Sequence, residues 1–371
     1  MEYLTTVSVS PEASFYKIEG ESQTQVERYI ATTPQSRNIC NRSELLGCEY
    51  TSQLREAMVA TLSHAPFAER IQAHDESRVC VLNFLRGGLN FDLRNALHQA
   101  YGLNRHSSAF MSSQRYKVDG QWQVNENMYR KLKIPRGAMM LVADVVATGV
   151  TLDSGFFVLL DHLLAIGSSI QHLVFFTFGC QKVEDYLTRY DELFRKHFPD
   201  YEGMSIVYFE GKFRLVDSFP NDTFRIAIHG TDLVRRDCLL APEFELSQYE
   251  SPAYPLERCT IYDAGSRAFD IPGYIEDVLE YWEEVAKLAS QGLTLTDALI
   301  ERWPEAEYVS HEQFLSHKRE SWRGVKDTLL NKLYAGYKAR WTEEFTQEAQ
   351  SSEALAKLCE ERISTLKSLM E

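Results

Sequence analysis

The sequence lacks the motifs that usually mark a disulfide or metal protein. Its seven cysteines include no C-x-x-C pair, and their number is odd. This pattern favours reduced thiols and disfavours both a disulfide scaffold and a structural zinc site. The ten histidines form no H-E-x-x-H motif, which removes the commonest signature of a zinc hydrolase. We therefore expect no metal that is held by protein ligands alone.

Long hydrophobic runs are also missing. The most apolar windows, 155–167 and 172–180, are too short to span a bilayer, and Asp161 and His162 interrupt the first of them. The first residues include Glu2 and no basic stretch followed by an apolar run, so they do not resemble a signal peptide. We expect a cytoplasmic protein without membrane contact.

Positive charge is in deficit. The chain has 39 Lys and Arg residues against 53 Asp and Glu residues, a formal net charge of −14. This balance argues against gross attraction to nucleic acid or to an anionic membrane. With 44% hydrophobic and 25% charged residues, the composition is that of a globular protein, and a length of 371 residues predicts about two domains.

The middle of the chain alternates short apolar runs with amphipathic segments. Strands are predicted at 79–85, 139–144 and 170–178, and a helical pattern follows each of them. Apolar strands joined by helical crossovers predict an α/β fold with a doubly wound, mainly parallel sheet. This domain is predicted over 78–270.

The flanking segments have different patterns. Residues 1–77 are predicted to be an N-terminal extension that is partly helical, and 271–371 a helical C-terminal region. Shorter runs at 204–210, 213–219 and 223–229 resemble antiparallel strands, and 238–255 resembles a loop. A β-rich hood or insertion near 200–258 is therefore predicted.

The most informative stretch is 139–152, MMLVADVVATGVTL. An apolar strand delivers Asp144 to its carboxyl end, where open α/β sheets bind ligands. The following turn carries Thr148, Gly149 and Thr151 and opens into a helix, so it offers backbone N–H groups, hydroxyls and a helix dipole to one anion. The turn is predicted to hold a phosphate, although T-G-x-T alone is also the pattern of a simple helix cap.

This stretch resembles the diphosphoribosyl-binding motif of type I phosphoribosyltransferases, which is an apolar strand, two acids, two apolar residues, A-T-G-G-T and a helix. The resemblance implies that Asp144 binds a ribose hydroxyl of phosphoribosyl diphosphate. It also implies a 5′-phosphate loop made of Ala147, Thr148, Gly149, Val150 and Thr151. Members that act on 6-oxopurines carry an acid at the position of Ala147, so the resemblance disfavours that substrate class.

Two positions depart from the motif. Val150 stands in place of a glycine, and Ala143 stands in place of the first acid. A missing charge-assisted hydrogen bond typically weakens binding by about 1.5–3 kcal/mol, which is roughly 10- to 100-fold in affinity. Ala143 therefore predicts weaker binding of the ribose, and turnover of phosphoribosyl diphosphate is left open.

A second element, LRGGL at 85–89, ends the first apolar strand. Glycines let a backbone approach a ligand closely, and a guanidinium can clamp phosphate oxygens. On residues alone, a plain strand-to-helix turn explains R-G-G equally well. The element resembles the pyrophosphate loop L-R-A-G-L of uracil phosphoribosyltransferases, which implies that Arg86 binds the diphosphate and that Gly87 and Gly88 approach it.

A third element, YDAGSRAF at 262–269, resembles the G-D-A-G-D-R-x-F segment of uracil phosphoribosyltransferases. That resemblance implies that Asp263, Ala264 and Gly265 approach the base or the ribose, and it favours a pyrimidine-like acceptor. Ser266 replaces the second aspartate of the segment. A polar turn before a helix is the other explanation.

Two further groups of residues are candidates by position. Asp119-Gly120 predicts a hairpin where these enzymes carry a mobile flap, and Arg115 and Lys117 on its first arm are either diphosphate ligands or solvated charges. Gly179 and Cys180, at the end of the third strand, are predicted either to line the base pocket or only to end a core strand.

The resemblance implies transfer of a phosphoribosyl group to a base or another acceptor, or cleavage of the donor, with Mg²⁺, an ion that the diphosphate itself would carry. The basic stretch 317–341, with interleaved aromatic residues, predicts either a protein or nucleic-acid partner or a solvated helix face. A second class of function therefore stays open, in which the same fold senses a nucleotide-like ligand in a regulatory or phage-defence protein. In either case a homo-oligomer or a larger complex is expected.

Overall fold

The fold is built on one large mixed sheet. The structure is a computed structural model that describes residues 2–20, 24–85, 87–112, 114–118, 121–125, 129–258, 264–303 and 309–370. The sheet has 11 strands in the order β13-β1-β2-β3-β11-β10-β9-β4-β5-β8, and β12 pairs with β11. The strands are β1 (Tyr3–Val9), β2 (Ser14–Glu19), β3 (Glu27–Thr32), β4 (Val79–Leu85), β5 (Ser107–Ser112), β8 (Arg130–Lys131), β9 (Ala138–Val146), β10 (Ile170–Cys180), β11 (Gly203–Leu215), β12 (Leu233–Leu240) and β13 (Trp322–Arg323).

The central strands are parallel from β3 through β11, β10, β9 and β4 to β5. Strands β4, β9 and β10 are buried over nearly their whole length without alternation because helices cover both faces of the sheet. Neighbouring residues of β10 show this directly. The ring of Phe175 contacts Phe156 on one face, and that of Phe176 contacts Phe67 on the other. The predicted doubly wound α/β fold is confirmed.

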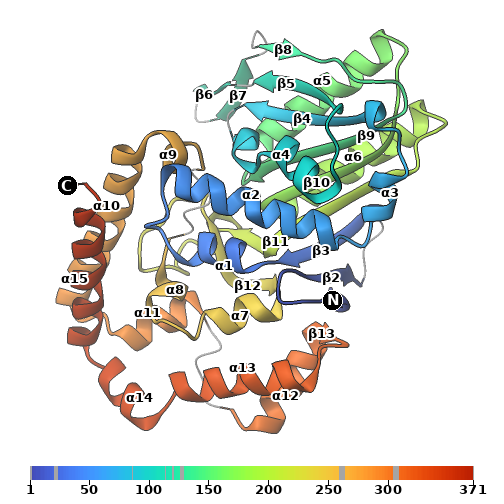
Figure 1. The fold of residues 1–371 in the computed structure, drawn as a ribbon. Coiled ribbons are helices and arrows are strands. Elements are labelled where there is room, and N and C mark those ends of the chain that lie inside the picture. The colour runs from blue at the N-terminus through green and yellow to red at the C-terminus, as the bar shows by residue number, and fades with distance from the viewer. Residues whose placement is uncertain are drawn as a thin grey trace.

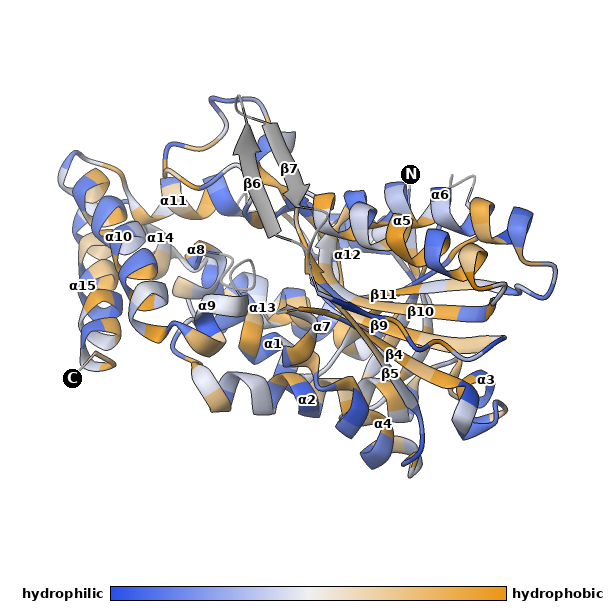
Figure 2. Cartoon of the chain, turned by 90° about the horizontal axis from the view of Figure 1, so that it is seen from above, coloured by the Kyte–Doolittle hydropathy of each residue, from blue (hydrophilic) through white to orange (hydrophobic). Residues whose placement is uncertain are grey.

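Helices form the outer layers (Figure 2). Helices α5 (Val150–Ala165) and α6 (Gln181–His197) cover one face, and α2 (Gly47–His64) and α4 (Leu93–Tyr101) cover the other. The short helices α1 (Pro34–Asn41) and α3 (Ala68–Gln72) join the second layer. The helical part predicted for residues 1–77 consists of α1, α2 and α3, and a turn at residues 65–67 separates the last two.

The N-terminal segment extends the sheet rather than standing apart from it. Strand β3 pairs in parallel with β11, and β2 and β1 add antiparallel strands beyond it. Tyr16 of β2 and Ile30 of β3 are completely buried in the main core. The segment therefore contributes both strands and core side chains to the α/β body.

Strand β11 differs from the prediction for this region. The two strands predicted at 204–210 and 213–219 form one strand of 13 residues inside the sheet, and 223–229 contains no strand. A bulge at Glu210, whose φ is 66°, lets the strand bend and continue. A Cβ on Gly211 would lie 2.4 Å from Leu240 Cδ2, so this glycine allows β12 to pair closely. The break in the apolar pattern at 210–211 is therefore a bulge within one strand and not a turn between two strands.

Glu210 is a completely buried carboxylate. Thr32 Oγ1 donates a hydrogen bond of 2.6 Å to Glu210 Oε2, and Thr33 N donates one of 3.1 Å to Oε1. Burial raises the pKa of Glu210 to about 7, although Arg37 and these donors oppose the shift. A carboxyl that holds its proton more tightly when folded stabilises the fold at low pH.

Stability should therefore fall as pH rises through the pKa of Glu210. The contribution is complete below pH 4.5, the unfolded value, and disappears as pH passes about 7. At about 1.36 kcal/mol per pKa unit, the loss approaches about 3 kcal/mol. Urea unfolding of wild type and Glu210→Gln from pH 4.5 to 7.5 measures it, since the glutamine variant has no such titration. A constant difference between the two proteins over this range would contradict the assignment.

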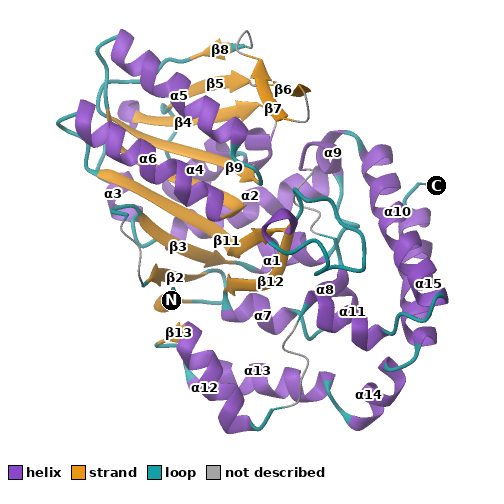
Figure 3. Ribbon diagram, turned by 180° about the vertical axis from the view of Figure 1, so that it is seen from behind, coloured by secondary structure: helices purple, strands orange, loops and turns teal. Residues whose placement is uncertain are grey.

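The C-terminal helices pack in two places. Helices α10 (Ile271–Ser290) and α15 (Ser352–Ser368) lie side by side and share a second core that includes Trp282 and Leu355 (Figure 3). Helices α12 (His311–Ser321) and α13 (Asp327–Arg340) instead join the main core beneath the N-terminal strands (Figure 1). The remaining helices are α7 (Pro242–Ser247), α8 (Ala253–Leu256), α9 (Ala264–Phe269), α11 (Leu295–Arg302) and α14 (Glu343–Ala349).

The basic stretch 317–341 is partly buried. Lys318 is 6% exposed and forms an ion pair with Glu245 at 2.5 Å. Arg340 is also buried and donates to the carbonyl oxygens of Gln248 and Tyr249. These two cations hold α12 and α13 on α7 and the segment after it, so they are not part of an open basic surface.

Candidate active site

The order of the parallel strands locates the site. From β4 onward the parallel strands are, in chain order, β4, β5, β9, β10 and β11, but in space they run β5-β4-β9-β10-β11, with β3 beyond β11. The chain therefore moves outward in one direction from β4 to β5 and in the opposite direction from β9 onward. Doubly wound sheets with this order bind ligands beyond the carboxyl ends of the two strands where the direction changes. Here these ends are Leu85 of β4 and Val146 of β9.

The glycine pair and Asp144 meet at this point. A Cβ on Gly87 would lie 2.6 Å from Asp144 Oδ1, and one on Gly88 would lie 2.7 Å from the Ala143 carbonyl oxygen. Only glycine permits so close an approach of the 3₁₀ helix η2 (Gly87–Phe91) to β9. The structure thus brings together two elements that the sequence separates by more than 50 residues. Arg86 lies outside the described residues.

Asp144 and Ala143 have different surroundings. Asp144 is half-buried, and its Oδ1 accepts a hydrogen bond of 2.9 Å from Val145 N. Ala143 is 1% exposed within the core. The carboxylate that this strand offers at the carboxyl edge of the sheet is therefore that of Asp144.

The predicted phosphate loop lies between β9 and α5. Ala147 and Gly149 are buried, whereas Thr148, Val150 and Thr151 are half-buried. Gly149 is the N-cap of α5 with a φ of 76°, in the left-handed region that favours glycine. The N–H groups of the first turn of a helix have no partner within that helix, so the start of α5 could hold an anion, and the phosphate role of the loop stays a prediction.

Tyr186 of α6 packs directly on this loop, and the sequence showed no sign of it. A Cβ on Gly149 would lie 2.3 Å from Tyr186 Cε2. The neighbouring Arg189 forms an ion pair with Asp153 in the first turn of α5. In the sequence Tyr186 was one apolar position of an amphipathic helix, and its contact with Gly149 exists only in the folded chain.

A side chain at Gly149 should therefore be costly. We expect Gly149→Ala to lose about 1–2 kcal/mol from its left-handed backbone and more from the collision with Tyr186. Gly167→Ala is the matched control, because Gly167 has a φ of 63° but nothing within 4 Å of an added Cβ. Chemical unfolding measures both free energies. Equal losses in the two variants would show that Tyr186 does not restrain the loop.

Cys180 connects the neighbouring strand to the loop. It is 2% exposed, and its Sγ donates a hydrogen bond of 3.2 Å to the Ala147 carbonyl oxygen. Burial raises the pKa of this thiol to about 11, so it is protonated and unreactive at neutral pH. Gly179 is buried beside Thr177 and Val183. Lining of a base pocket by these two residues stays a prediction.

The C-terminal element reaches the same region. Helix α9, which contains Gly265, contacts η2, the element that begins with Gly87 and Gly88. Asp263 lies outside the described residues, as does the side chain of Ala264. The predicted base or ribose contacts of the three residues stay predictions.

The predicted hairpin is present. Strands β6 (Gln114–Val118) and β7 (Gln121–Asn125) are antiparallel, with Val118 opposite Gln121, and β7 contacts α5. The hairpin therefore lies beside the helix that follows the phosphate loop. Arg115 and Lys117 are on β6, but their side chains lie outside the described part of the structure, so their role as flap residues stays a prediction.

A metal site of protein ligands is not found among the described residues, where no group of three or more His, Cys, Asp or Glu side chains could hold an ion. Within the same residues, no helix combines the length and the apolar character needed to cross a membrane.

The chain matches no protein-family model and no curated protein. Among solved structures it is similar to the AQ2163 protein from Aquifex aeolicus, with 16% identity over 48% of this chain and 84% of that chain and a TM-score of 0.33. Hypoxanthine-guanine phosphoribosyltransferase from L. donovani gives 16% identity, coverage of 47% and 91%, and a TM-score of 0.27. Hypoxanthine phosphoribosyltransferase from Trypanosoma cruzi gives 15%, 53% and 91%, and 0.25.

The latter two proteins are purine enzymes by name, whereas the sequence resemblance at 85–89 and 262–269 was to uracil enzymes. At TM-scores this low, the likeness carries no argument about the reaction or the acceptor. The proposed function therefore depends on this chain's own residues and on their arrangement at the carboxyl ends of β4 and β9, where the strand order changes direction. We call this place the switch point.

Proposed function

We propose that this protein binds phosphoribosyl diphosphate at the switch point between β4 and β9 and transfers its phosphoribosyl group. The observation that carries the proposal is the contact of the Gly87-Gly88 turn with Asp144, next to the 147–151 loop. A turn for diphosphate, a carboxylate for ribose and a loop for the 5′-phosphate are then neighbours on one edge of the sheet.

Each part has a chemical task. Transfer of a ribosyl group develops positive charge on the sugar while the diphosphate leaves, so the site must neutralise the leaving group and hold the sugar. Asp144 would accept hydrogen bonds from the ribose hydroxyls. The backbone N–H groups at the start of α5 would hold the 5′-phosphate, and Arg86 with the Gly87-Gly88 turn would bind the diphosphate.

Magnesium fits this donor set only as an ion that the ligand carries. The described residues offer Asp144 but no cluster of protein ligands, and Mg²⁺ prefers phosphate oxygens with one or two carboxylates. The ion would supply positive charge to the departing diphosphate. For the acceptor, we propose a pyrimidine-like base.

A second candidate is a regulatory or defence protein that senses a nucleotide-like ligand on the same fold. The burial of Ala143 in place of an acid favours it, because the ligand would be held by one carboxylate. The helical C-terminal region, with its own core, also exceeds what a transfer site requires.

One experiment separates the two. The purified protein is incubated with phosphoribosyl diphosphate and Mg²⁺ while diphosphate release is followed with uracil, with hypoxanthine and without a base, and donor binding is measured by calorimetry. Base-dependent release supports the transferase. Saturable binding without release supports the sensor. Absence of donor binding would contradict both.

A further inference from the structure

A cavity of about 360 Å³ lies far along the sheet from the switch point. Its walls come from the β1–β2 hairpin, β3, α1, α7 and residues 325–332 at the start of α13. We call it the hairpin cavity. Its volume falls in the range of about 300–1,000 Å³ that small-molecule sites occupy. None of its lining residues belongs to the turn, strand or loop of the proposed transfer site.

The charge of the hairpin cavity is positive. Arg37, Lys326 and Lys332 line it, against one carboxylate, Glu243. Glu243 already accepts hydrogen bonds of 2.9 and 2.8 Å from the hydroxyl of Tyr16, a completely buried residue. Among the described residues, none forms an ion pair with any of the three cations. The charges of Lys326 and Lys332 are therefore available to a ligand, and Arg37 adds positive potential although it also acts on the buried Glu210.

The positive charges are not spread over a flat surface. Arg37 is half-buried, and its Nη1 donates a hydrogen bond of 2.7 Å to Thr32 Oγ1, which fixes the guanidinium at the cavity wall. Thr32 in turn donates to Glu210 in β11. A guanidinium held in this way loses less conformational freedom when it binds an anion.

The rest of the lining has both apolar and hydroxyl side chains. Val9, Pro11, Val325 and Leu329 are its apolar residues, which we call the apolar wall, and Thr6, Ser10, Ser14, Thr32 and Thr328 add hydroxyl groups. A ligand that fills it needs an anionic end and a body that tolerates hydrocarbon contact. The surplus of two positive charges matches a phosphate monoester, which carries about −1.5 to −2 at neutral pH.

We propose that the hairpin cavity binds an organic phosphate monoester of nucleoside monophosphate size. Its phosphate lies among Arg37, Lys326 and Lys332, and its ring lies on the apolar wall. Because residues from both ends of the chain form the cavity, the ligand would also hold α13 against the N-terminal hairpin.

Calorimetric titration tests this with uridine and adenosine 5′-monophosphate, inorganic phosphate and the two unphosphorylated nucleosides as probes. Lys326→Gln/Lys332→Gln removes two exposed cations of the cavity, so the fold should be unaffected. Lys338→Gln is the matched control, an exposed lysine of α13 outside the cavity. We expect a monophosphate to bind wild type and Lys338→Gln alike, and to bind the double variant at least about 10-fold more weakly.

Two results would overturn the proposal. Equal monophosphate affinity in wild type and the double variant would place all binding at the switch point. Equal affinity for inorganic phosphate and both monophosphates would show that the apolar wall takes no part. The Asp144→Asn variant keeps the cavity unchanged, so its retained response to Lys326→Gln/Lys332→Gln distinguishes this site from the transfer site even if no transfer activity is found.

Discussion

Replacing Asp144 with asparagine should reduce kcat/KM for diphosphate release at least about 100-fold. An amide keeps the shape of the side chain, and its oxygen can still accept the hydrogen bond from Val145 N. It removes the negative charge that would bind the ribose hydroxyls and stabilise the cation-like sugar. Two charge-assisted hydrogen bonds are each worth about 1.5–3 kcal/mol, which sets the expected loss.

The measurement is steady-state release of diphosphate together with donor affinity by calorimetry. Asp161→Asn is the matched control, because Asp161 is exposed on α5, toward the end opposite the phosphate loop. Both variants should unfold at the same temperature as wild type. If Asp144→Asn released diphosphate at the wild-type rate, Asp144 would take no part in the site and the proposed chemistry would be wrong.

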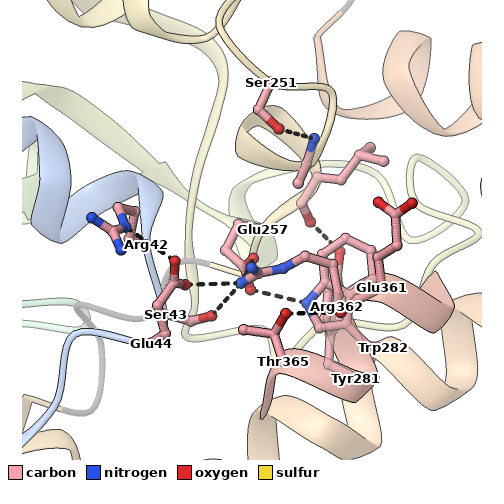
Figure 4. A network of polar contacts seen from close by, with 12 residues as sticks. Arg42, Ser43, Glu44, Ser251, Glu257, Tyr281, Trp282, Glu361, Arg362 and Thr365 are labelled. Atoms are coloured by element: carbon pink, nitrogen blue, oxygen red, sulfur yellow. Dashed lines mark hydrogen bonds and ion pairs between the residues drawn. The ribbon is translucent and has the colours of Figure 1, made fainter. Parts of the chain in front are cut away.

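Replacing Arg362 with methionine should destabilise the fold by about 3–5 kcal/mol, the usual loss when a buried ion pair loses one partner. Arg362 of α15 donates to Ser43 Oγ at 2.9 Å, Glu44 Oε2 at 3.1 Å and Glu257 Oε2 at 2.9 Å (Figure 4). Burial already raises the pKa of Glu257. Without the Arg362 guanidinium, the Glu257 carboxylate would still accept the hydrogen bond from Trp282 Nε1, but it would have lost its neighbouring cation.

Urea unfolding measures the loss, and two further variants assign its cause. Lys367 lies on α15 like Arg362, and Lys367→Met removes its exposed ion pair with Glu283 of α10, which should change stability by less than about 1 kcal/mol. Adding Glu257→Gln to Arg362→Met should recover much of the loss, because it removes the buried charge. If the double variant is no more stable than Arg362→Met, the loss comes from packing and not from Glu257.

The parallel core could be predicted because its signals are local. The segments 79–85, 139–144 and 170–178 are continuous apolar runs, and each precedes a helical pattern. The structure places β4, β9 and β10 there with slightly different bounds. Asp144 and Gly149 belong to one short stretch, so their proximity also followed from the sequence.

Other features depend on partners that are distant in the sequence. Glu27 of β3 lies opposite Ser205 of β11, and no local pattern predicts that pairing. The bulge at Glu210 looked like a strand end because Gly211 interrupts the apolar pattern, while the reason for the glycine is the side chain of Leu240. The hairpin cavity was likewise invisible, since it requires the first strands and α13 to come together.

The pairing of β13 with β1 has a consequence for synthesis of the chain. Thr6 Oγ1 donates to the carbonyl oxygen of Arg323, a residue 317 positions later. At about 5–20 residues per second, a ribosome needs roughly 15–60 s to make that interval. Throughout this time Leu4 and Thr5, which pair with Trp322 and Arg323 in the folded chain, have no strand beside them, and such unpaired margins promote association between chains. Nascent molecules of this protein should therefore associate through β1 more readily before Trp322 and Arg323 emerge than afterwards.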